Sequence, residues 1–219
     1  MKNQPKHIKL KLLPYHQYQG VDLNDPIRFY YWPLLGSLYR KRVEMCLDKC
    51  QGGERILEVG FGTGLSFLNL QELYQEIYGL DLEVSIEQVK AVFESREVNL
   101  NLRNGTVLQM PYENGFFDTV LLVSILEHLK PGELELAFSE IWRVLKPGGQ
   151  VVFGIPVERP FMAATFRLMG VNIREHHYST HEDVIKAVEK IFDNGKSSVI
   201  FLNVFPVGKL YQVGCFLRP

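Results

Sequence analysis

Short apolar runs alternate with amphipathic stretches from about residue 54 onward. RILEV, IYGLDL and DTVLLVSIL are strand-like, and the third is apolar almost throughout. Such a run is typical of a strand covered on both faces, as in a parallel sheet flanked by helices. Between these runs, SIEQVKAVFESRE carries an apolar stripe at helical spacing. The alternation predicts an α/β domain with a mostly parallel sheet.

The clearest helix in the pattern is GELELAFSEIWRVLKPGG. One apolar face is predicted by five residues at helical spacing, namely Leu134, Phe138, Ile141, Trp142 and Leu145. We expect Pro147, Gly148 and Gly149 to stop this helix, since proline cannot continue it and glycine accepts a left-handed cap. QVVFGIP should then form a strand. The C-terminal SSVIFLNVFPVGKLYQVGCFLRP should form an antiparallel hairpin that turns at PVGK.

The chain before residue 54 follows a different pattern. PIRFYYWPLLGSLYRKRVEMCLDKC is aromatic-rich and then helical. We predict that residues 1–50 form an N-terminal helical extension, or lid, packed beside the ligand mouth. Residues 51–219 should form one compact domain, since a chain of this length favours a single core.

Charge and composition are those of an ordinary globular protein. The 219 residues carry a formal charge of −1 and are 46% hydrophobic. This balance does not favour a nucleic-acid partner, which needs clustered Lys and Arg. The first 21 residues contain four lysines and no acidic residue, namely Lys2, Lys6, Lys9 and Lys11. We interpret this stretch as a solvated arm, and contact with a polyanion or a membrane surface is the less favoured alternative.

The chain shows no signal-peptide pattern and no apolar run long enough for a transmembrane helix. Cys46, Cys50 and Cys215 are odd in number and lack the spacing of a metal site, so we expect buried, reduced thiols. These features predict a cytoplasmic protein with no metal cofactor. The oligomeric state is not predicted.

Gly60, Gly62 and Gly64 follow the strand RILEV directly. Glycine lacks a Cβ atom, so a ligand can approach the backbone there. A dinucleotide fingerprint would need a third glycine at the position of Leu65. Asp81 ends the next strand, where a carboxylate can accept the hydroxyls of a ribose. A tight strand-to-helix turn, and a helix cap for Asp81, are the alternatives without a ligand.

Four motifs in register now resemble a known family. ILEVGFGTG, YGLDL, NGTVLQMPYENGFFDTVLLVSILEHL and IWRVLKPGGQVVFGIP are similar to the successive motifs of class I S-adenosylmethionine-dependent methyltransferases, closest to the methyltransferase type 11 group. The resemblance covers roughly residues 50–158. It implies a Rossmann-like, doubly wound, seven-stranded, mostly parallel sheet completed by the C-terminal hairpin. It also implies S-adenosylmethionine as cofactor and S-adenosylhomocysteine as product.

The resemblance assigns roles to individual positions. Glu58 and the backbone around Gly60 would hold the methionine amine, and Asp81 the ribose, with Glu83 as a less favoured substitute. Val107 would lie against adenine, and Ser124 near the methionine moiety. The full cofactor set implied is Glu58, Gly60, Phe61, Gly62, Thr63, Gly64, Asp81, Leu82, Thr106, Val107 and Ser124.

One position departs from the family pattern. Many relatives have an acidic residue after the glycine of the third motif, where it reads the adenine amino group, but here Thr106 follows Gly105. Thr106 could accept one hydrogen bond, or Gln109 could substitute. Since a neutral hydrogen bond contributes roughly 0.5–1.5 kcal/mol net, we expect weaker cofactor binding rather than its loss.

Methyl transfer from a sulfonium depends mainly on alignment, and a base is needed only when the acceptor must lose a proton. The candidate bases are His128, His176, His177 and Tyr178, and surface or capping roles are the alternative for the histidines. The candidate acceptor contacts lie in FYYWP and PVERPFMAATFRLMG, and they are Tyr30, Tyr31, Phe161 and Phe166. Packing of these side chains on the core would explain their apolar character equally well.

The sequence as a whole favours a methyltransferase. We expect in-line methyl transfer to a small molecule or to a lipid- or sugar-linked intermediate. The alternatives are a non-catalytic methyltransferase-like binding protein and, less favoured, a nicotinamide-dependent oxidoreductase.

Overall fold

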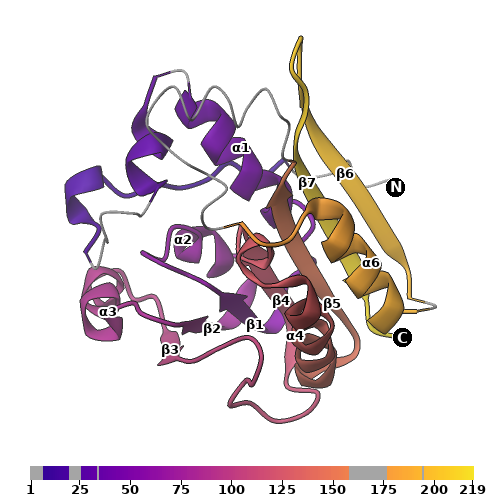
Figure 1. The fold of residues 1–219 in the computed structure, drawn as a ribbon. Helices are drawn as coiled ribbons and strands as arrows, with labels where there is room; N and C mark the ends of the chain where they lie inside the picture. The colour runs from indigo at the N-terminus through magenta and orange to yellow at the C-terminus, as the bar shows by residue number, and fades with distance from the viewer. Residues whose placement is uncertain (1–6, 20–25, 34, 158–176, 194) are drawn as a thin grey trace, which may run out of the picture.

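The computed structural model describes residues 7–19, 26–33, 35–157, 177–193 and 195–219. One sheet contains seven strands in the order β3-β2-β1-β4-β5-β7-β6 (Figure 1). The strands are β1 (Gly53–Val59), β2 (Tyr74–Asp81), β3 (Leu100–Asn104), β4 (Phe117–Val123), β5 (Leu145–Pro156), β6 (Ser197–Val204) and β7 (Gly208–Leu217).

The first five strands run parallel, and β7 lies antiparallel between β5 and β6. The predicted mostly parallel sheet with a C-terminal hairpin is therefore confirmed. The chain winds outward from β1 through β2 to β3 and then returns to β4 on the other side of β1. In open sheets of this kind, ligands bind beyond the carboxyl ends of the strands at such a switch point.

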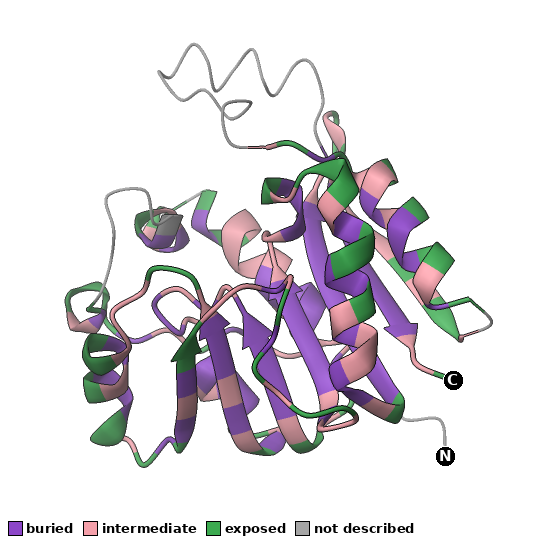
Figure 2. Ribbon diagram, turned by 60° about the horizontal axis from the view of Figure 1, so that its bottom comes forward, coloured by how far each residue is buried: buried purple, intermediate pink, exposed green. Residues whose placement is uncertain are grey.

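Helices cover both faces of the sheet. The helices α1 (Leu35–Leu47), α2 (Phe67–Leu70) and α3 (Ile86–Glu94) pack on one face, and α4 (Pro131–Val144) and α6 (His181–Ile191) lie side by side on the other. Three short 3-10 helices complete the described elements, namely η1 (Tyr15–Gln17), η2 (Pro26–Tyr31) and η3 (Leu126–His128). In Figure 2 the central strands are largely buried, whereas the helices turn exposed residues outward.

Helix α4 ends before the predicted stop signal. Its last residue is Val144, and Leu145 is already extended and pairs with Phe117 of β4. The prediction that Pro147 and the two following glycines end the helix was therefore wrong, because strand pairing ends it first. Trp142 is also only half-buried, and the guanidinium of Arg218 lies 3.6 Å from its ring centroid.

The described N-terminal segment 7–19 runs along α1 and α2, and residues 8–11 are held there through their backbone. The Ile8 N–H donates to Asp48 Oδ1 (2.6 Å), and the Leu10 N–H donates to Glu44 Oε1 (3.1 Å). The Asn69 side chain accepts the Lys11 N–H and donates to the Lys9 carbonyl, both at 2.9 Å. These contacts agree with an extension packed on the sheet domain. The division at residues 50 and 51 stays a prediction.

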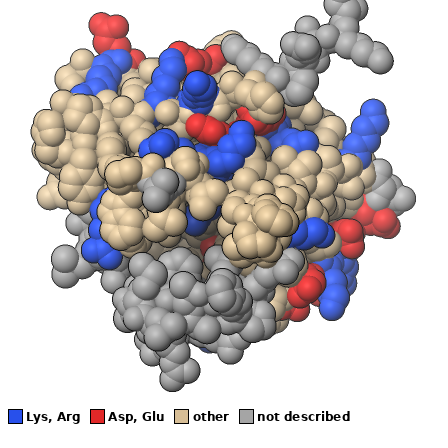
Figure 3. All heavy atoms as spheres, turned by 90° about the horizontal axis from the view of Figure 1, so that it is seen from above, with Lys and Arg blue, Asp and Glu red and all other residues tan. Residues whose placement is uncertain are grey.

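Surface charge is mixed on the face that Figure 3 draws, where Lys and Arg atoms lie among Asp and Glu atoms. Within the described part of the chain, no helix is long and apolar enough to cross a membrane.

Candidate functional site

The loop after β1 contains the three glycines that the motif singled out. Gly60, Gly62 and Gly64 have φ angles of +69°, +51° and +74°, in the left-handed region that favours glycine. A Cβ atom on Gly64 would lie 2.5 Å from the Phe67 ring, and one on Gly60 would collide with the Ile125 side chain. Each of these positions therefore needs glycine for the fold of the loop itself, whether or not a ligand binds.

Asp81 joins this loop to the end of β2. The Gly62 N–H donates to Asp81 Oδ2 (2.9 Å), and the Glu83 N–H donates to Oδ1 (3.3 Å). Helix α3 has Ser85 at its N-cap position, so Asp81 is not the cap of that helix. A carboxylate offers about four acceptor positions. Asp81 thus keeps the capacity to accept two hydroxyl groups of a ligand.

Glu58, at the end of β1, is only 6% exposed, and its Oε2 accepts a hydrogen bond from the Ser66 hydroxyl. The pKa of Glu58 is raised to about 8, mainly by burial. The hydrogen bond from Ser66 lowers this pKa, and the charge of Asp81 raises it, but both effects are smaller than that of burial. Ser66 carried no motif signal. The visible role of Glu58 is to hold the loop, and its contact with the methionine amine stays a prediction.

Three other predicted cofactor residues differ in exposure. Phe61 is buried and packs over Gly79, where a Cβ atom would lie 2.6 Å from its ring, and Thr63 is also buried. Leu82 follows Asp81 and is 69% exposed. The Phe61 and Thr63 side chains therefore stabilise the loop, whereas Leu82 is accessible to a ligand.

The third motif forms a tight turn beside β2. The Gly105 N–H donates to the Asp81 carbonyl (2.9 Å), which brings this turn to the same end of the sheet. Thr106 Oγ1 accepts the Leu108 N–H (3.2 Å), and the Thr106 carbonyl accepts the Gln109 N–H (3.3 Å). Val107 is buried. The hydroxyl oxygen of Thr106 thus stabilises its own turn, and the weak contact with adenine stays a prediction.

Ser124 connects three elements at the end of β4. It adopts φ +58°, and its hydroxyl accepts a hydrogen bond from Arg42 Nη2 of α1 (2.9 Å). The same hydroxyl lies 3.0 Å from the hydroxyl of Tyr211 in β7. Tyr211 is buried, and burial raises its pKa well above the usual value. Ser124 thus lies at the end of β4, beside the switch point of the sheet, and its place near the methionine moiety stays a prediction.

The guanidinium of Arg42 sits between aromatic rings, 4.7 Å from the Tyr39 centroid and 4.8 Å from the Tyr211 centroid. Burial lowers the pKa of Arg42, but the combined effect of four nearby groups outweighs burial and raises the pKa overall, so the guanidinium stays charged. These groups are Tyr211, Tyr30, Tyr39 and Glu127. Sequence reasoning missed both Arg42 and Tyr211. In YRKRVE, Arg42 looks like its neighbouring helix-surface cations.

The candidate bases meet beyond β4. The rings of His128 and His177 lie edge to face with centroids 5.1 Å apart, close to Glu127. The Tyr178 N–H donates to the Glu127 carbonyl (2.8 Å), whereas the Tyr178 side chain is exposed. His176, like the acceptor candidates Phe161 and Phe166, lies outside the described residues.

The two acceptor candidates of the N-terminal segment point to different neighbours. Tyr30 is buried, contacts the Tyr39 ring and lies close enough to Arg42 to affect its pKa. Tyr31 donates its hydroxyl to the Leu13 carbonyl and so holds segment 7–19. Tyr30 therefore lies near Arg42, whereas Tyr31 is bonded to segment 7–19.

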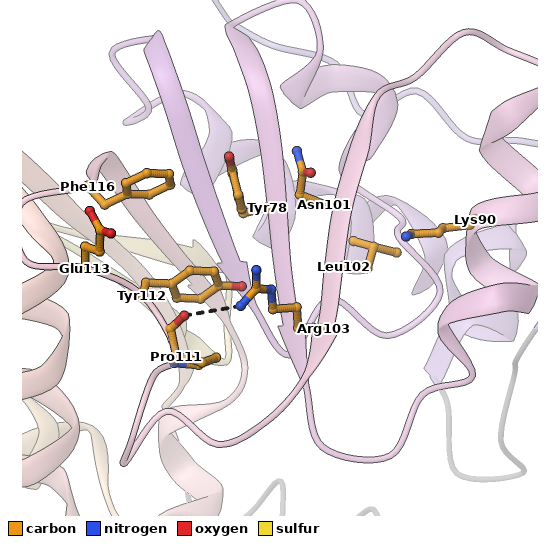
Figure 4. Close-up of a pocket in the computed structure, with 9 residues that line it drawn as sticks. All are labelled: Tyr78, Lys90, Asn101, Leu102, Arg103, Pro111, Tyr112, Glu113 and Phe116. Carbon is orange, nitrogen blue, oxygen red and sulfur yellow. Dashed lines mark hydrogen bonds between the residues drawn. The ribbon is translucent and has the colours of Figure 1, made fainter.

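A separate pocket of about 570 Å³ opens at the β2–β3 edge (Figure 4). Arg103 lies beside the Tyr112 ring there and donates to the Pro111 carbonyl (3.4 Å). The residues that line it include none of the glycine loop and none of the predicted cofactor residues. This pocket is therefore distinct from the site around the glycine loop.

The fold and the loop together define a class, the class I S-adenosylmethionine-dependent methyltransferase domain. Residues 57–153 match the family model described as a methyltransferase domain, so the resemblance is confirmed and the chain carries a domain of this family. Demethylmenaquinone methyltransferase of Thermus thermophilus is 31% identical over 118 residues, 52% of this chain and 51% of that protein. The chain spans about half the length of the curated relatives it matches.

Solved structures share the fold at low sequence identity. Geranyl diphosphate C-methyltransferase from Streptomyces coelicolor A3(2), in complex with Mg²⁺, geranyl diphosphate and S-adenosylhomocysteine, has a TM-score of 0.69 at 13% identity. That match covers 97% of this chain and 91% of the other. The [4+2]-cyclase SpnF has a TM-score of 0.68 at 16% identity, over 91% of this chain and 86% of its own. These likenesses show the fold alone.

Proposed function

We propose that the protein transfers a methyl group from S-adenosylmethionine to a small-molecule acceptor. The observation that carries this proposal is the bond between the Gly62 N–H and Asp81, which joins a loop with three left-handed glycines to a carboxylate with spare acceptor capacity. That pair fits a ligand with two vicinal hydroxyls lying along the backbone. The bound cofactor would supply a sulfonium, whose methyl carbon bonds to the acceptor while the C–S electron pair stays on sulfur.

The acceptor would enter beside Ser124. Arg42, Tyr211 and Tyr30 converge there from three different elements, and His128 and His177 lie beyond them. Rigid side chains around the switch point would align the acceptor, which is the main requirement of an in-line displacement. Lipid- or sugar-linked intermediates belong to the proposed range. Relatives and fold neighbours named for demethylmenaquinone and geranyl diphosphate support this range.

Isothermal titration with S-adenosylmethionine and S-adenosylhomocysteine, with NADH as control, tests the cofactor. We expect micromolar binding of the first two and none of NADH. NADH binding alone would instead support the nicotinamide-dependent alternative. If none of the three ligands binds, the proposal that S-adenosylmethionine is the cofactor is rejected.

Incubation with methyl-labelled S-adenosylmethionine separates an enzyme from a non-catalytic binding protein. A fold neighbour that is named as a cyclase shows why this step is needed, since a shared fold does not specify the reaction. Demethylmenaquinone and geranyl diphosphate are suitable first acceptors. Label in an acceptor supports transfer, whereas tight cofactor binding without transfer across a broad acceptor panel supports a binding protein.

A further inference from the structure

Glu127, His128 and His177 form a compact cluster of metal-ligating side chains. One ligand atom from each lies within 4.8 Å of the other two. Glu127 is 2% exposed, His128 is exposed, and His177 is intermediate, so the cluster reaches from the protein interior to solvent. Glu127 and His128 belong to η3, directly after β4, whereas His177 comes from the segment before α6.

Backbone hydrogen bonds fix the two histidines relative to each other. The N–H groups of Tyr178 and Ser179 both donate to the Glu127 carbonyl, at 2.8 and 3.2 Å. The Ser179 hydroxyl donates to the Leu129 carbonyl (2.6 Å). These three bonds hold the chain at residues 177–179 against residues 127–129. The two backbone segments that carry the histidines are therefore held together by bonds that do not involve the imidazoles.

We propose that this cluster binds a divalent transition-metal ion of the zinc class. Two imidazoles and one carboxylate form a donor set that Zn²⁺ uses where it keeps an open coordination position. Ligand atoms around one tetrahedral zinc ion lie roughly 3.4 Å apart, so small side-chain rotations would bring atoms now within 4.8 Å into range. Magnesium fits less well because it prefers oxygen ligands in octahedral geometry. The exposed side at His128 leaves room for water or an acceptor oxygen.

The thiols do not compete for this ion. Cys46, Cys50 and Cys215 are all buried, and burial raises the pKa of each thiol above its usual value. A thiol must lose its proton to bind zinc, so these three are poor ligands.

The cluster lies next to the proposed transfer site. Glu127 follows Ser124 by three residues, and the Ser124 hydroxyl bonds to Arg42 and lies 3.0 Å from the Tyr211 hydroxyl. An acceptor hydroxyl bound to the ion would lose its proton more readily, because the positive charge stabilises the oxyanion. This role rests on the proposed methyl transfer, whereas the metal site itself does not.

Equilibrium dialysis of untagged, chelator-treated protein against Zn²⁺, followed by elemental analysis, tests the site. We expect about one ion per chain in the wild type. His128→Ala and His177→Ala should each weaken zinc binding at least about tenfold, since even outer-shell changes cost 10–100-fold. His181→Ala is the matched control, because this histidine lies in α6 and pairs with Glu182 instead. Cobalt absorption bands that disappear in the two cluster variants would give a second, spectroscopic readout.

Absence of zinc binding in the wild type would overturn the proposal, as would equal binding in the cluster variants or an equal loss in His181→Ala. Mg²⁺ that competes with Zn²⁺ at equal concentration would overturn the assignment to the zinc class. Titration of each variant with S-adenosylmethionine checks the fold independently. Zinc binding in a protein that does not bind S-adenosylmethionine would reject the proposed function and leave the metal site standing.

Discussion

The cofactor half and the acceptor half of the molecule are built in different ways. The cofactor half comes from three consecutive connections, those after β1, β2 and β3. Asp81 links them, since its carboxylate accepts the Gly62 N–H and its carbonyl accepts the Gly105 N–H. In the acceptor half, by contrast, side chains of α1 and β7 contact Ser124, and a side chain from the segment before α6 contacts His128. The first half depends on loop conformation and the second on tertiary packing. Substitutions should therefore affect the two halves differently.

The largest expected effect is in the glycine loop. Gly64→Val would place a branched side chain at φ +74° and into the rings of Phe67 and Phe93. Left-handed strain and overpacking each cost about 1–3 kcal/mol, so unfolding free energy should fall by about 3 kcal/mol or more. Urea titration measures the loss. Gly132→Val is the control, since nothing lies within 4 Å of a Cβ atom there. Equal stability of the two variants would contradict the tight loop.

Asp81→Ala should act on cofactor affinity rather than on the fold. Loss of hydrogen bonds to a charged carboxylate should weaken S-adenosylmethionine binding by roughly 1.5–3 kcal/mol. Calorimetric titration measures this change, and the exposed Asp193→Ala serves as the control. Unchanged affinity in Asp81→Ala, with a loss in Glu83→Ala, would transfer the ribose contact to Glu83.

The raised pKa of Glu58 predicts that stability falls as pH rises. The folded protein keeps a proton on Glu58 up to about pH 8, whereas the unfolded chain releases it near 4.5. The stabilising contribution is fully present below the unfolded pKa and is lost as pH approaches the folded pKa. Between pH 5 and 7 the loss should be about 2 kcal/mol. Glu58→Gln should flatten this slope in urea titrations across the range, and an unchanged slope would reject Glu58 as its source.

The smallest expected effect compares two variants of Ser124. Both Ser124→Ala and Ser124→Gly remove the hydroxyl that bonds to Arg42 and Tyr211, but only glycine relieves the backbone at φ +58°. Ser124→Gly should therefore be more stable than Ser124→Ala by about 1 kcal/mol. Thermal unfolding of the two proteins measures the difference. The reverse order would mean that the left-handed conformation carries no strain.

Local pattern explains which features were predictable. Strand runs, the hairpin at PVGK and the glycine loop are continuous in sequence, so hydrophobic period and turn residues identify them. The predicted end of α4 at Pro147 failed because Leu145 is taken up by pairing with β4, a tertiary contact. For the same reason, the partnership of Ser66 with Glu58 had no signal of its own.

Features assembled from segments that are distant in sequence could not be predicted from it. Arg42, Ser124 and Tyr211 are brought together only by packing of α1 against the sheet. Glu127 is likewise joined by backbone bonds to Tyr178 and Ser179, the residues that follow His177, and no short motif encodes these bonds. The expectation of no metal cofactor was drawn from the number and spacing of the cysteines, which carry no information about a cluster of glutamate and histidine side chains. Residue spacing thus predicts cofactor loops better than acceptor pockets.

The contacts of segment 7–19 have a consequence for sequence divergence. Asn69 presents one acceptor and one donor, as a neighbouring peptide group would, and it binds the main chain at Lys11 and Lys9. Asp48 and Glu44 also bind main-chain N–H groups. These bonds hold residues 8–11 through the main chain, whereas the rest of the segment also uses side chains, since Tyr18 is buried and Gln17 accepts a hydrogen bond from Arg96. Homologous proteins should therefore be able to vary the exposed Lys9, which contributes only its carbonyl, while keeping Asn69 and the path of the chain.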